Sequence, residues 1–231
     1  MSKANTRKTV KYSFFQVDPL WRRLPADQKT DGKEEFAAVV EEFASHMPIR
    51  SYGLVGLRAD ADFLLWQIAD SLEAVQELAV RLNHTGLGKY LRTPYSYLAM
   101  TRRSEYVDDH RHPGQEGTRL TIKPSETPYL VLYPFVKTRQ WYLLPKEERQ
   151  RMMNLHFEVG HRYPTVKINT TYSFGLDDQE FVVAFNTTSP SDFLDLVEEL
   201  RHTETSGYTL RDTPVFTCIA RPLRETLDAL G

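Results

Sequence analysis

The segment Trp21-Arg-Arg-Leu-Pro25 returns later in the chain as Trp141-Tyr-Leu-Leu-Pro145, and this repetition determines the fold. Two further pairs of segments repeat with it: Gly56-Leu-Arg-Ala-Asp60-Ala-Asp62-Phe63 with Gly175-Leu-Asp-Asp-Gln-Glu180-Phe181, and His84-Thr85 with His202-Thr203. The offset stays close to 120 residues throughout, between 120 for the tryptophans and 118 for the histidines. The sequence therefore predicts two equivalent folding units in tandem.

The duplication supplies an internal comparison, since one scaffold position can be inert in the first copy and chemically capable in the second. Three matched positions differ in this way: Phe36 against His156, Ser13 against Tyr133, and Val17 against Lys137. The candidate functional residues are therefore expected in the second copy.

Composition excludes several classes of protein. The 231 residues carry a net charge of −2, with a pI near 6.4 and no basic stripe, so nucleic acid is not expected as the main partner. The sequence contains no run of 18 apolar residues, so no membrane span is expected. The polar N-terminus does not have the pattern of a signal peptide. The single cysteine, Cys218, lies in an apolar run and is expected to be a small buried hydrophobe; a cytoplasmic location fits this.

Each copy is predicted to run β-α-β-β-α-β. In the first copy we expect strands near 10–17, 50–57, 62–68 and 95–100, with helices from about Lys33 and from Asp70 or Ser71. In the second copy we expect strands near 129–137, 165–174, 180–185 and 213–220, a helix from Pro145 to about His161, and a helix capped by Ser189. This order is the ferredoxin-like unit, an α+β fold with helices on one face of an antiparallel sheet. Two such sheets can pack back to back or curl into open barrels.

The expected domains are an N-terminal half (1–105) without a cofactor, a connecting segment (106–128) and a C-terminal half (129–231). The connecting segment contains the polar stretch Asp108-Asp-His-Arg-His-Pro-Gly-Gln-Glu-Gly117. It is either a flexible linker or an ordered flap over a site. His110 and His112 form its densest cluster of possible metal ligands, but their spacing is no specific metal signature, and a solvated loop is the favoured interpretation.

His156 is the leading candidate for chemistry. It shares one helix face with Met152, Val159 and Tyr163, and Gly160 adds a gap one turn further on. The imidazole could present a ring nitrogen to a flat cofactor, although a lone histidine on such a face also fits a satisfied core residue.

A ligating histidine needs an acceptor for its second nitrogen. Glu204 and the turn Asp177-Asp178-Gln-Glu180 are the candidates. In the first copy the residue two after His84-Thr85 is Leu87, not a carboxylate, which favours Glu204 over a merely solvated helix end.

Tyr133 and Lys137 lie four residues apart on one strand and share a face, so they could serve as redox and proton-transfer groups beside a metal. A core tyrosine and a solvated lysine are the structural alternatives. Arg119 precedes this strand, where a guanidinium would suit a carboxylate ligand, or else is an ordinary surface arginine.

Taken together, these segments resemble the chlorite dismutase superfamily, and within it the coproheme decarboxylase branch, over nearly the whole chain. The stretches that carry the resemblance are Leu132–Lys137, Trp141–Arg149, Met152–His156, Gly175–Phe181 and Leu200–Ser206. The resemblance implies paired ferredoxin-like halves of the dimeric α/β-barrel type, an iron porphyrin in the C-terminal half, and a homopentamer.

The resemblance also implies roles for particular residues. His156 would be the proximal iron ligand, with Glu204 as its hydrogen-bond partner. Tyr133 would be the radical-forming tyrosine and Lys137 its neighbouring lysine. The remaining implied contacts to the porphyrin are Arg119 and Ser206 at the propionates and Trp141 near the porphyrin edge.

One position departs from the family pattern. Ile168 stands where chlorite dismutases have arginine and many decarboxylases have glutamine. An aliphatic side chain cannot stabilise a developing oxyanion, which argues against chlorite chemistry. A distal base could instead come from the connecting segment, which holds His110, His112 and Glu116.

The expected function is oxidative decarboxylation of iron coproporphyrin III to haem b by hydrogen peroxide. The iron carries the redox chemistry, and the protein supplies placement and electrostatics. The alternatives are a chlorite dismutase-like enzyme or weak haem peroxidase, and a non-enzymatic haem-binding protein.

Overall fold

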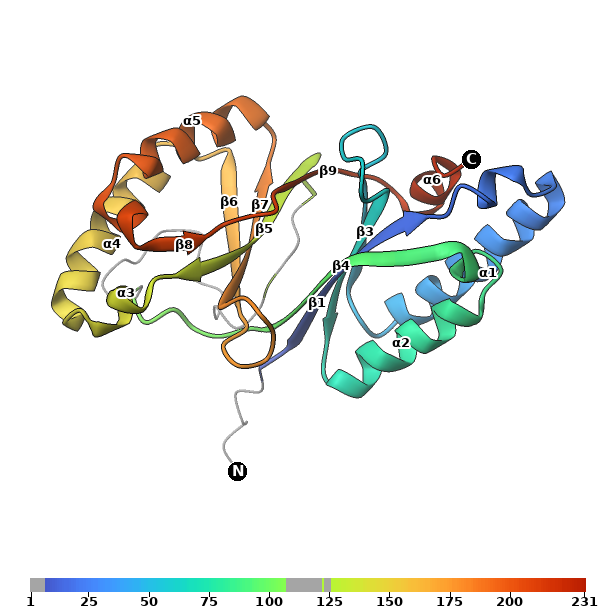
Figure 1. The fold of residues 1–231 in the computed structure, drawn as a ribbon, viewed down its shortest axis with the longest axis horizontal. Coiled ribbons are helices and arrows are strands. Elements are labelled where there is room, and N and C mark those ends of the chain that lie inside the picture. Colours follow the sequence, from blue (N-terminus) through green and yellow to red (C-terminus); the bar gives the residue numbers. More distant parts are fainter. Residues whose placement is uncertain (1–6, 107–121, 123–125) are drawn as a thin grey trace. The chain divides into compact units, whose positions relative to one another are not determined.

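The structure, a computed structural model, describes residues 7–106, 122 and 126–231. These residues form two compact units, shown in Figure 1: unit 1 comprises Met1–Met100 with Thr217–Gly231, and unit 2 comprises Thr101–Phe216. Both units are α+β, and both follow the ferredoxin-like plan predicted from the duplication. No helix within the described ranges is long and apolar enough to cross a membrane.

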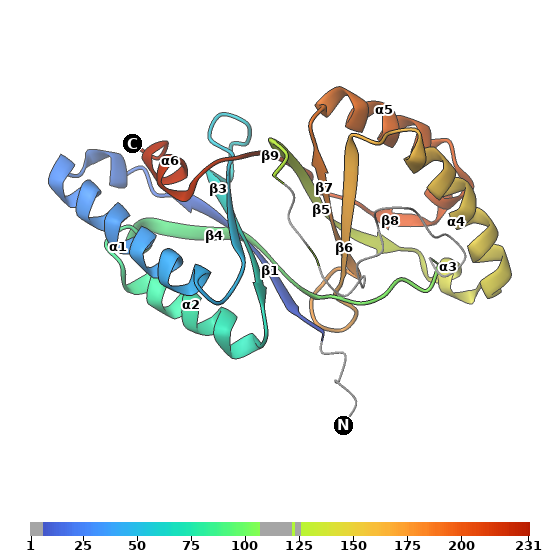
Figure 2. The ribbon, with the colours of Figure 1, turned by 180° about the vertical axis from the view of Figure 1, so that it is seen from behind.

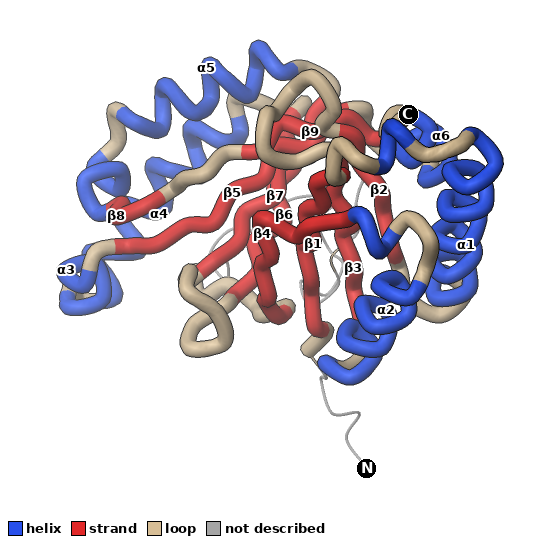
Figure 3. Tube along the Cα trace, turned by 45° about the vertical axis from the view of Figure 1, so that its right-hand side comes forward, coloured by secondary structure: helices blue, strands red, loops and turns tan. Residues whose placement is uncertain are grey.

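Unit 1 is built from an antiparallel sheet with two long helices on one face (Figure 3). Its strands pair in the order β4-β1-β3-β2, and β9 follows at the edge of β2. In chain order the elements are β1 (Thr9–Val17), η1 (Trp21–Arg23), α1 (Ala26–Ala44), β2 (Ile49–Gly53), β3 (Phe63–Ala69), α2 (Leu72–His84), η2 (Gly88–Tyr90) and β4 (Leu91–Met100), then β9 (Phe216–Ala220) and α6 (Leu223–Asp228).

Unit 2 repeats the plan, with strands in the order β6-β7-β5-β8. Its helices α4 and α5 pack together on one face of the sheet, as Figure 2 shows from behind. The elements are β5 (Tyr129–Lys137), α3 (Arg139–Leu143), α4 (Lys146–His161), β6 (Val166–Tyr172), β7 (Phe181–Thr187), α5 (Pro190–Arg201), η3 (Glu204–Tyr208) and β8 (Thr209–Arg211).

The structure confirms Ser189 as the predicted cap of α5, and of the two expected starts of α2, Asp70 and Ser71, it shows Ser71 as the cap. Ser71 Oγ accepts a hydrogen bond from the Ala74 amide at 3.2 Å at the start of α2. Ser189 Oγ accepts one from the Asp192 amide at 3.2 Å, with Pro190 in the first turn of α5. Each hydroxyl satisfies an amide that the first turn of a helix leaves without a partner.

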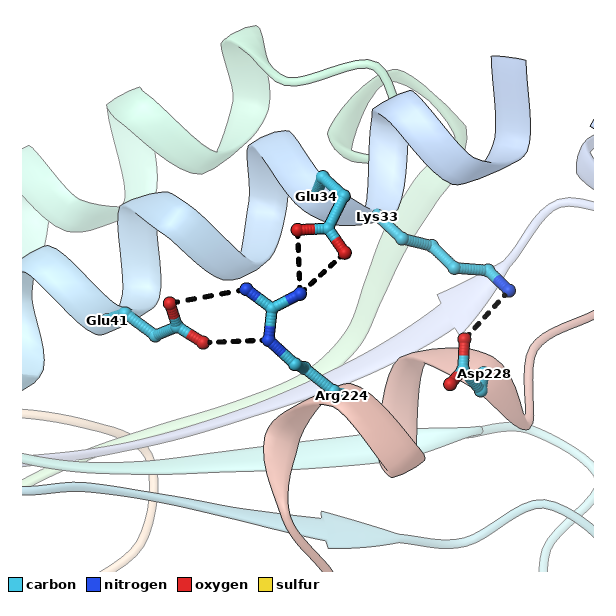
Figure 4. Close-up of polar contacts among 5 residues, drawn as sticks. All are labelled: Lys33, Glu34, Glu41, Arg224 and Asp228. Carbon is cyan, nitrogen blue, oxygen red and sulfur yellow. Dashed lines mark hydrogen bonds and ion pairs between the residues drawn. The ribbon is translucent and has the colours of Figure 1, made fainter. Parts of the chain in front are cut away.

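The C-terminal stretch belongs to unit 1, whereas the sequence places it with the second half. Leu227 and Leu230 are buried in the core of unit 1. Figure 4 shows how α6 is also tied to α1: Arg224 binds Glu34 at 2.5 Å and Glu41 at 3.1 Å, and Lys33 binds Asp228 at 3.3 Å. These ion pairs are exposed, so the buried leucines contribute most of the attachment.

Cys218 on β9 is fully buried, as expected for a small core residue. Burial raises the pKa of its thiol above the ordinary value, so the reactive thiolate is suppressed.

Apolar side chains fill the space between the sheet and the helices of unit 1. The Phe15 and Phe63 rings stack at 4.8 Å, and Phe36 of α1 meets both edge-on at 6.2 and 6.0 Å. Phe36 is fully buried. Position 36, the counterpart of 156, therefore acts as a packing residue in the first copy.

We predict that Phe36→Ala lowers the free energy of unfolding by about 3–5 kcal/mol, because the cavity left beside the Phe15 and Phe63 rings cannot collapse. Urea unfolding at neutral pH measures this change. Leu143→Ala is the control, since that side chain is 83 % exposed and should change stability by less than about 0.5 kcal/mol. Equal effects from the two substitutions would contradict the packing described here.

Candidate functional site

The buried apolar cluster on the sheet of unit 2 is small. Among the described residues, it contains three members, Val131, Val183 and Phe185. The corresponding cluster of unit 1 contains seventeen buried members. Around the smaller cluster Tyr133 and Phe135 remain only partly buried. This apolar cluster is therefore much smaller than its counterpart in the first copy.

His156 of α4 shares a helix face with the buried residues Met152 and Val159. Its Nδ1 lies 3.5 Å from the hydroxyl oxygen of Thr205 on η3, at the long end of the hydrogen-bond range. Among the described residues, Nε2 has no hydrogen-bond partner. Burial, and then the positive charge of Lys137, lower the pKa of His156 to about 4. The imidazole is therefore neutral at physiological pH, which is the form that ligates metals.

Gly160 keeps space open one turn after His156. A Cβ atom built at Gly160 would meet no heavy atom within 4 Å. A neutral imidazole with a free nitrogen, beside the open space at Gly160, fits a flat ring system whose metal is bound by one histidine.

Lys137 at the end of β5 is only 9 % exposed. Its Nζ donates a hydrogen bond to the Thr205 carbonyl oxygen at 2.9 Å and lies 4.6 Å from the centre of the Trp141 ring. Burial lowers its pKa to about 8, and the carboxylate of Glu180 offsets part of that effect. An ammonium group with a pKa this close to neutrality can exchange its proton far more readily than an ordinary lysine.

Tyr133 lies in the middle of β5 and stacks on Phe185, with the ring centres 5.8 Å apart. Burial raises its pKa above the ordinary value, and the negative charge of Asp212 raises it further. Asp212 is itself paired with Arg201 at the end of α5. The phenol of Tyr133 therefore keeps its proton at physiological pH.

Glu204 does not contact His156 in the structure. Its carboxylate is 58 % exposed and binds Arg151 of α4 at 2.6 Å, and this ion pair lowers its pKa. Thr205, the next residue of η3, provides the oxygen nearest to Nδ1 of His156. The other candidate, Glu180, accepts hydrogen bonds from the Lys137 amide at 2.8 Å and the Tyr142 hydroxyl at 2.5 Å.

The remaining predicted site residues lie on different elements of unit 2 or outside the described residues. Trp141 is buried between the rings of Tyr106 and Tyr208, at 6.3 and 5.5 Å. Ser206 is half-buried on η3, and Ile168 of β6 is 54 % exposed. Arg119, His110, His112 and Glu116 lie outside the described residues. Within the part of the chain that is described, no group of three or more His, Cys, Asp or Glu side chains converges on a common point.

Thr205 is the functional candidate that the sequence reasoning missed. The signal was present in the duplication, because Leu87 stands two residues after Thr85, as Thr205 stands two residues after Thr203. Leu87 therefore corresponds to Thr205, and the counterpart of Glu204 is Gly86 rather than Leu87, with which Glu204 was compared above.

The lowered pKa of His156 predicts a pH-dependent stability. An unfolded histidine takes up its proton below about pH 6.5, whereas the folded one does so only near pH 4, so the unfolded state binds more protons between these values. His156 therefore leaves the free energy of unfolding undiminished above about pH 6.5 and lowers it increasingly as the pH falls toward 4. His156→Phe, which copies Phe36, should remove that loss. Urea unfolding of both proteins from pH 7 to pH 4 should show their free-energy difference growing as the pH falls, and a constant difference would contradict the prediction.

Comparison with known proteins relates the sequence to a single protein family. The sequence model of the chlorite dismutase family matches residues 29–221. The chain is 32 % identical over 212 residues to the coproheme decarboxylase of Mycolicibacterium smegmatis, covering 90 % of this chain and 89 % of the relative.

Two solved structures show the same fold. A mutant chlorite dismutase from Candidatus Nitrospira defluvii superposes with a TM-score of 0.87 at 27 % identity, over 96 % of this chain and 95 % of the other. A structure described as a novel heme-binding protein from Thermus thermophilus gives 0.84 at 27 % identity, over 96 % and 94 %.

Proposed function

The chain belongs to the chlorite dismutase family, and on this basis we propose that it is a haem-type enzyme that decarboxylates iron coproporphyrin III to haem b with hydrogen peroxide. The relative named coproheme decarboxylase supports this choice within the family, at 32 % identity across 90 % of the chain. Iron coproporphyrin is then both the substrate and the redox centre.

One observation carries the proposal: ionisable side chains replace packing residues at matched positions of the second unit. His156 replaces the fully buried Phe36, and Lys137 replaces Val17, which is also buried in the core of unit 1. Tyr133 replaces Ser13. Burial lowers the pKa values of His156 and Lys137 and raises that of Tyr133, and such shifted pKa values are typical of functional sites.

When bound, the iron porphyrin supplies the oxidising chemistry with peroxide. His156 would hold the iron through Nε2, since Nδ1 faces Thr205. Tyr133 keeps a proton on Oη and can release it with one electron, so that the oxidised ring takes a hydrogen atom from a propionate. Lys137 offers Nζ, with a pKa of about 8, to receive or return protons.

The overall balance fixes the stoichiometry. Each propionate loses carbon dioxide, one proton and two electrons as it becomes a vinyl group, and one peroxide takes two electrons and two protons to give two waters. One peroxide is therefore consumed for each vinyl group formed. Arg119 and Ser206 are proposed to hold propionates by charge and hydroxyl contacts, with Trp141 near the porphyrin edge.

There are two alternative functions: a chlorite dismutase-like or weakly peroxidatic enzyme, and a non-enzymatic haem-binding protein. Ile168 bears on the first, because its exposed aliphatic side chain has no donor for a developing oxyanion. The relative described as a heme-binding protein bears on the second.

Two parallel reactions test the proposal. The purified protein receives iron coproporphyrin III with peroxide in one, and haem b with chlorite at an oxygen electrode in the other. Haem b as the extracted product, with oxygen release no faster than from free haem, supports the decarboxylase. Rapid oxygen release without haem b formation supports the dismutase, and inactivity in both reactions with retained binding supports the haem-binding protein.

A further inference from the structure

Thr205 lies at the centre of a connected set of polar contacts behind His156. Its hydroxyl oxygen is 3.5 Å from His156 Nδ1 and 2.8 Å from the hydroxyl oxygen of Thr203. The Thr203 hydroxyl donates to the carbonyl oxygen of Leu200, at 2.7 Å, in the last turn of α5. The carbonyl of Thr205 accepts from Lys137 Nζ at 2.9 Å, which holds this part of η3 in place.

The direction of these hydrogen bonds follows from counting protons. A hydroxyl group has one proton to donate. Thr203 gives its proton to the Leu200 carbonyl, so it can only accept from Thr205. Thr205 then has no proton left for the imidazole and must accept from Nδ1 of His156. In this arrangement Nδ1 carries the hydrogen and Nε2 presents its lone pair.

We propose that Thr205, supported by Thr203, is the positioning residue that holds His156 as the Nδ1–H tautomer and so leaves Nε2 free to bind the iron. This inference rests on the proposed function for its iron ligand, but the tautomer itself is a property of the protein alone. The assignment replaces the carboxylate expected from the family resemblance with a neutral hydroxyl.

The first copy provides a control within the same chain. Thr85 repeats the bond made by Thr203, since its hydroxyl donates to the Leu82 carbonyl at 2.7 Å at the end of α2. The position equivalent to Thr205 is Leu87, and the position equivalent to His156 is Phe36; both are fully buried in the apolar core. The first threonine is therefore common to both copies as a helix-end contact, whereas the second hydroxyl accompanies the imidazole.

The acceptor type has a chemical consequence. A carboxylate partner draws the Nδ1 proton strongly and raises the basicity of the ligating nitrogen. Glu204 is instead neutralised by Arg151 on the exposed side of η3. A hydroxyl acceptor orients the ring with less transfer of negative charge, so we expect a weaker iron–histidine bond than a carboxylate partner would give.

Three variants test the assignment. Thr205→Val removes the hydroxyl while keeping the side-chain shape, Thr205→Ser keeps the hydroxyl, and Glu204→Gln removes the competing carboxylate. The tautomer is read from ¹⁵N chemical shifts of histidine-labelled protein without porphyrin, with the His156 signals assigned by their loss in His156→Phe. Far-ultraviolet circular dichroism checks that each variant is folded.

We expect one Nδ1–H tautomer in the wild type, in Thr205→Ser and in Glu204→Gln, and substantial Nε2–H population in Thr205→Val. With iron coproporphyrin added, Thr205→Val should bind roughly 10–100-fold more weakly, as for loss of other groups that orient a ligand, and Thr205→Ser should restore most of the affinity. The iron–histidine stretching frequency of Thr205→Val in the ferrous state should shift as well.

An unchanged tautomer in Thr205→Val, or a tautomer change in Glu204→Gln, would overturn the assignment. The outcome is separable from that of the proposed function. A tautomer change in Thr205→Val together with wild-type protein that never binds iron porphyrin supports the positioning by Thr205 and refutes the function.

Discussion

Replacing His156 by alanine is expected to abolish axial ligation of the iron. The imidazole is neutral because its pKa is lowered to about 4, and Nε2 has no competing hydrogen-bond partner among the described residues. Removing the ligand itself should weaken binding of iron coproporphyrin by more than the roughly 10–100-fold typical of a lost supporting group. Titration followed by absorption spectroscopy measures both the affinity and the loss of the histidine-ligated spectrum.

His161→Ala is the matched control, since His161 is at the exposed end of the same helix. That variant should bind the porphyrin as the wild type does. Imidazole added to His156→Ala should restore part of the ligated spectrum, because the substitution removes the ring and leaves space for a free imidazole. A histidine-ligated spectrum in His156→Ala without imidazole would mean that another residue holds the iron.

Replacing Tyr133 by phenylalanine should stop decarboxylation and leave porphyrin binding unchanged. The ring and its stacking on Phe185 are retained, so only the hydroxyl is lost. With its raised pKa, that hydroxyl keeps the proton that the proposed hydrogen-atom transfer requires. We expect the rate of haem b formation to fall at least about 100-fold, the lower end of what a positioned proton-transfer group contributes.

Tyr129→Phe provides the comparison, because Tyr129 lies on the same strand and the same face, four residues from Tyr133. Its rate should stay within about twofold of the wild type, since Tyr129 makes none of the contacts on which the proposed chemistry depends. Haem b formation at a normal rate in Tyr133→Phe would refute the role given to this tyrosine, even if His156 binds the iron.

Most of the fold could be predicted from sequence patterns, because the duplication repeats the pattern of the main strands and helices in both copies. The boundaries of β5 were predicted correctly, and α4 begins one residue after Pro145, as expected from the proline at its start. The helix α1 begins at Ala26, seven residues before the expected Lys33, because its polar first turns do not show the apolar spacing that the prediction used.

The attachment of the C-terminus could not be predicted from the sequence. Leu227 and Leu230 lie on a helix of six residues and just beyond it, too short for any periodic pattern. Their burial depends on the core of unit 1, which is formed by residues more than 100 positions away in the chain. Only the tertiary structure brings these segments together.

The candidate site was predicted by residue type but not by contact. His156, Tyr133 and Lys137 follow directly from the comparison of the two copies. The partner of His156 does not, because Glu204 and Thr205 are neighbours on a short 3₁₀ turn and their side chains point in different directions. A carboxylate is the stronger acceptor in general, but geometry rather than acceptor strength decides which oxygen reaches Nδ1.

Conversion of iron coproporphyrin III to haem b by the second unit can be followed directly in a peroxide titration. Hydrogen peroxide is added in steps to the protein loaded with iron coproporphyrin III, and the mass of the porphyrin is measured after each addition. We expect stepwise loss of two carboxyl groups, each with its own equivalent of peroxide, ending at haem b. A tightly bound porphyrin that keeps all its carboxyl groups and is only bleached would contradict the proposed function.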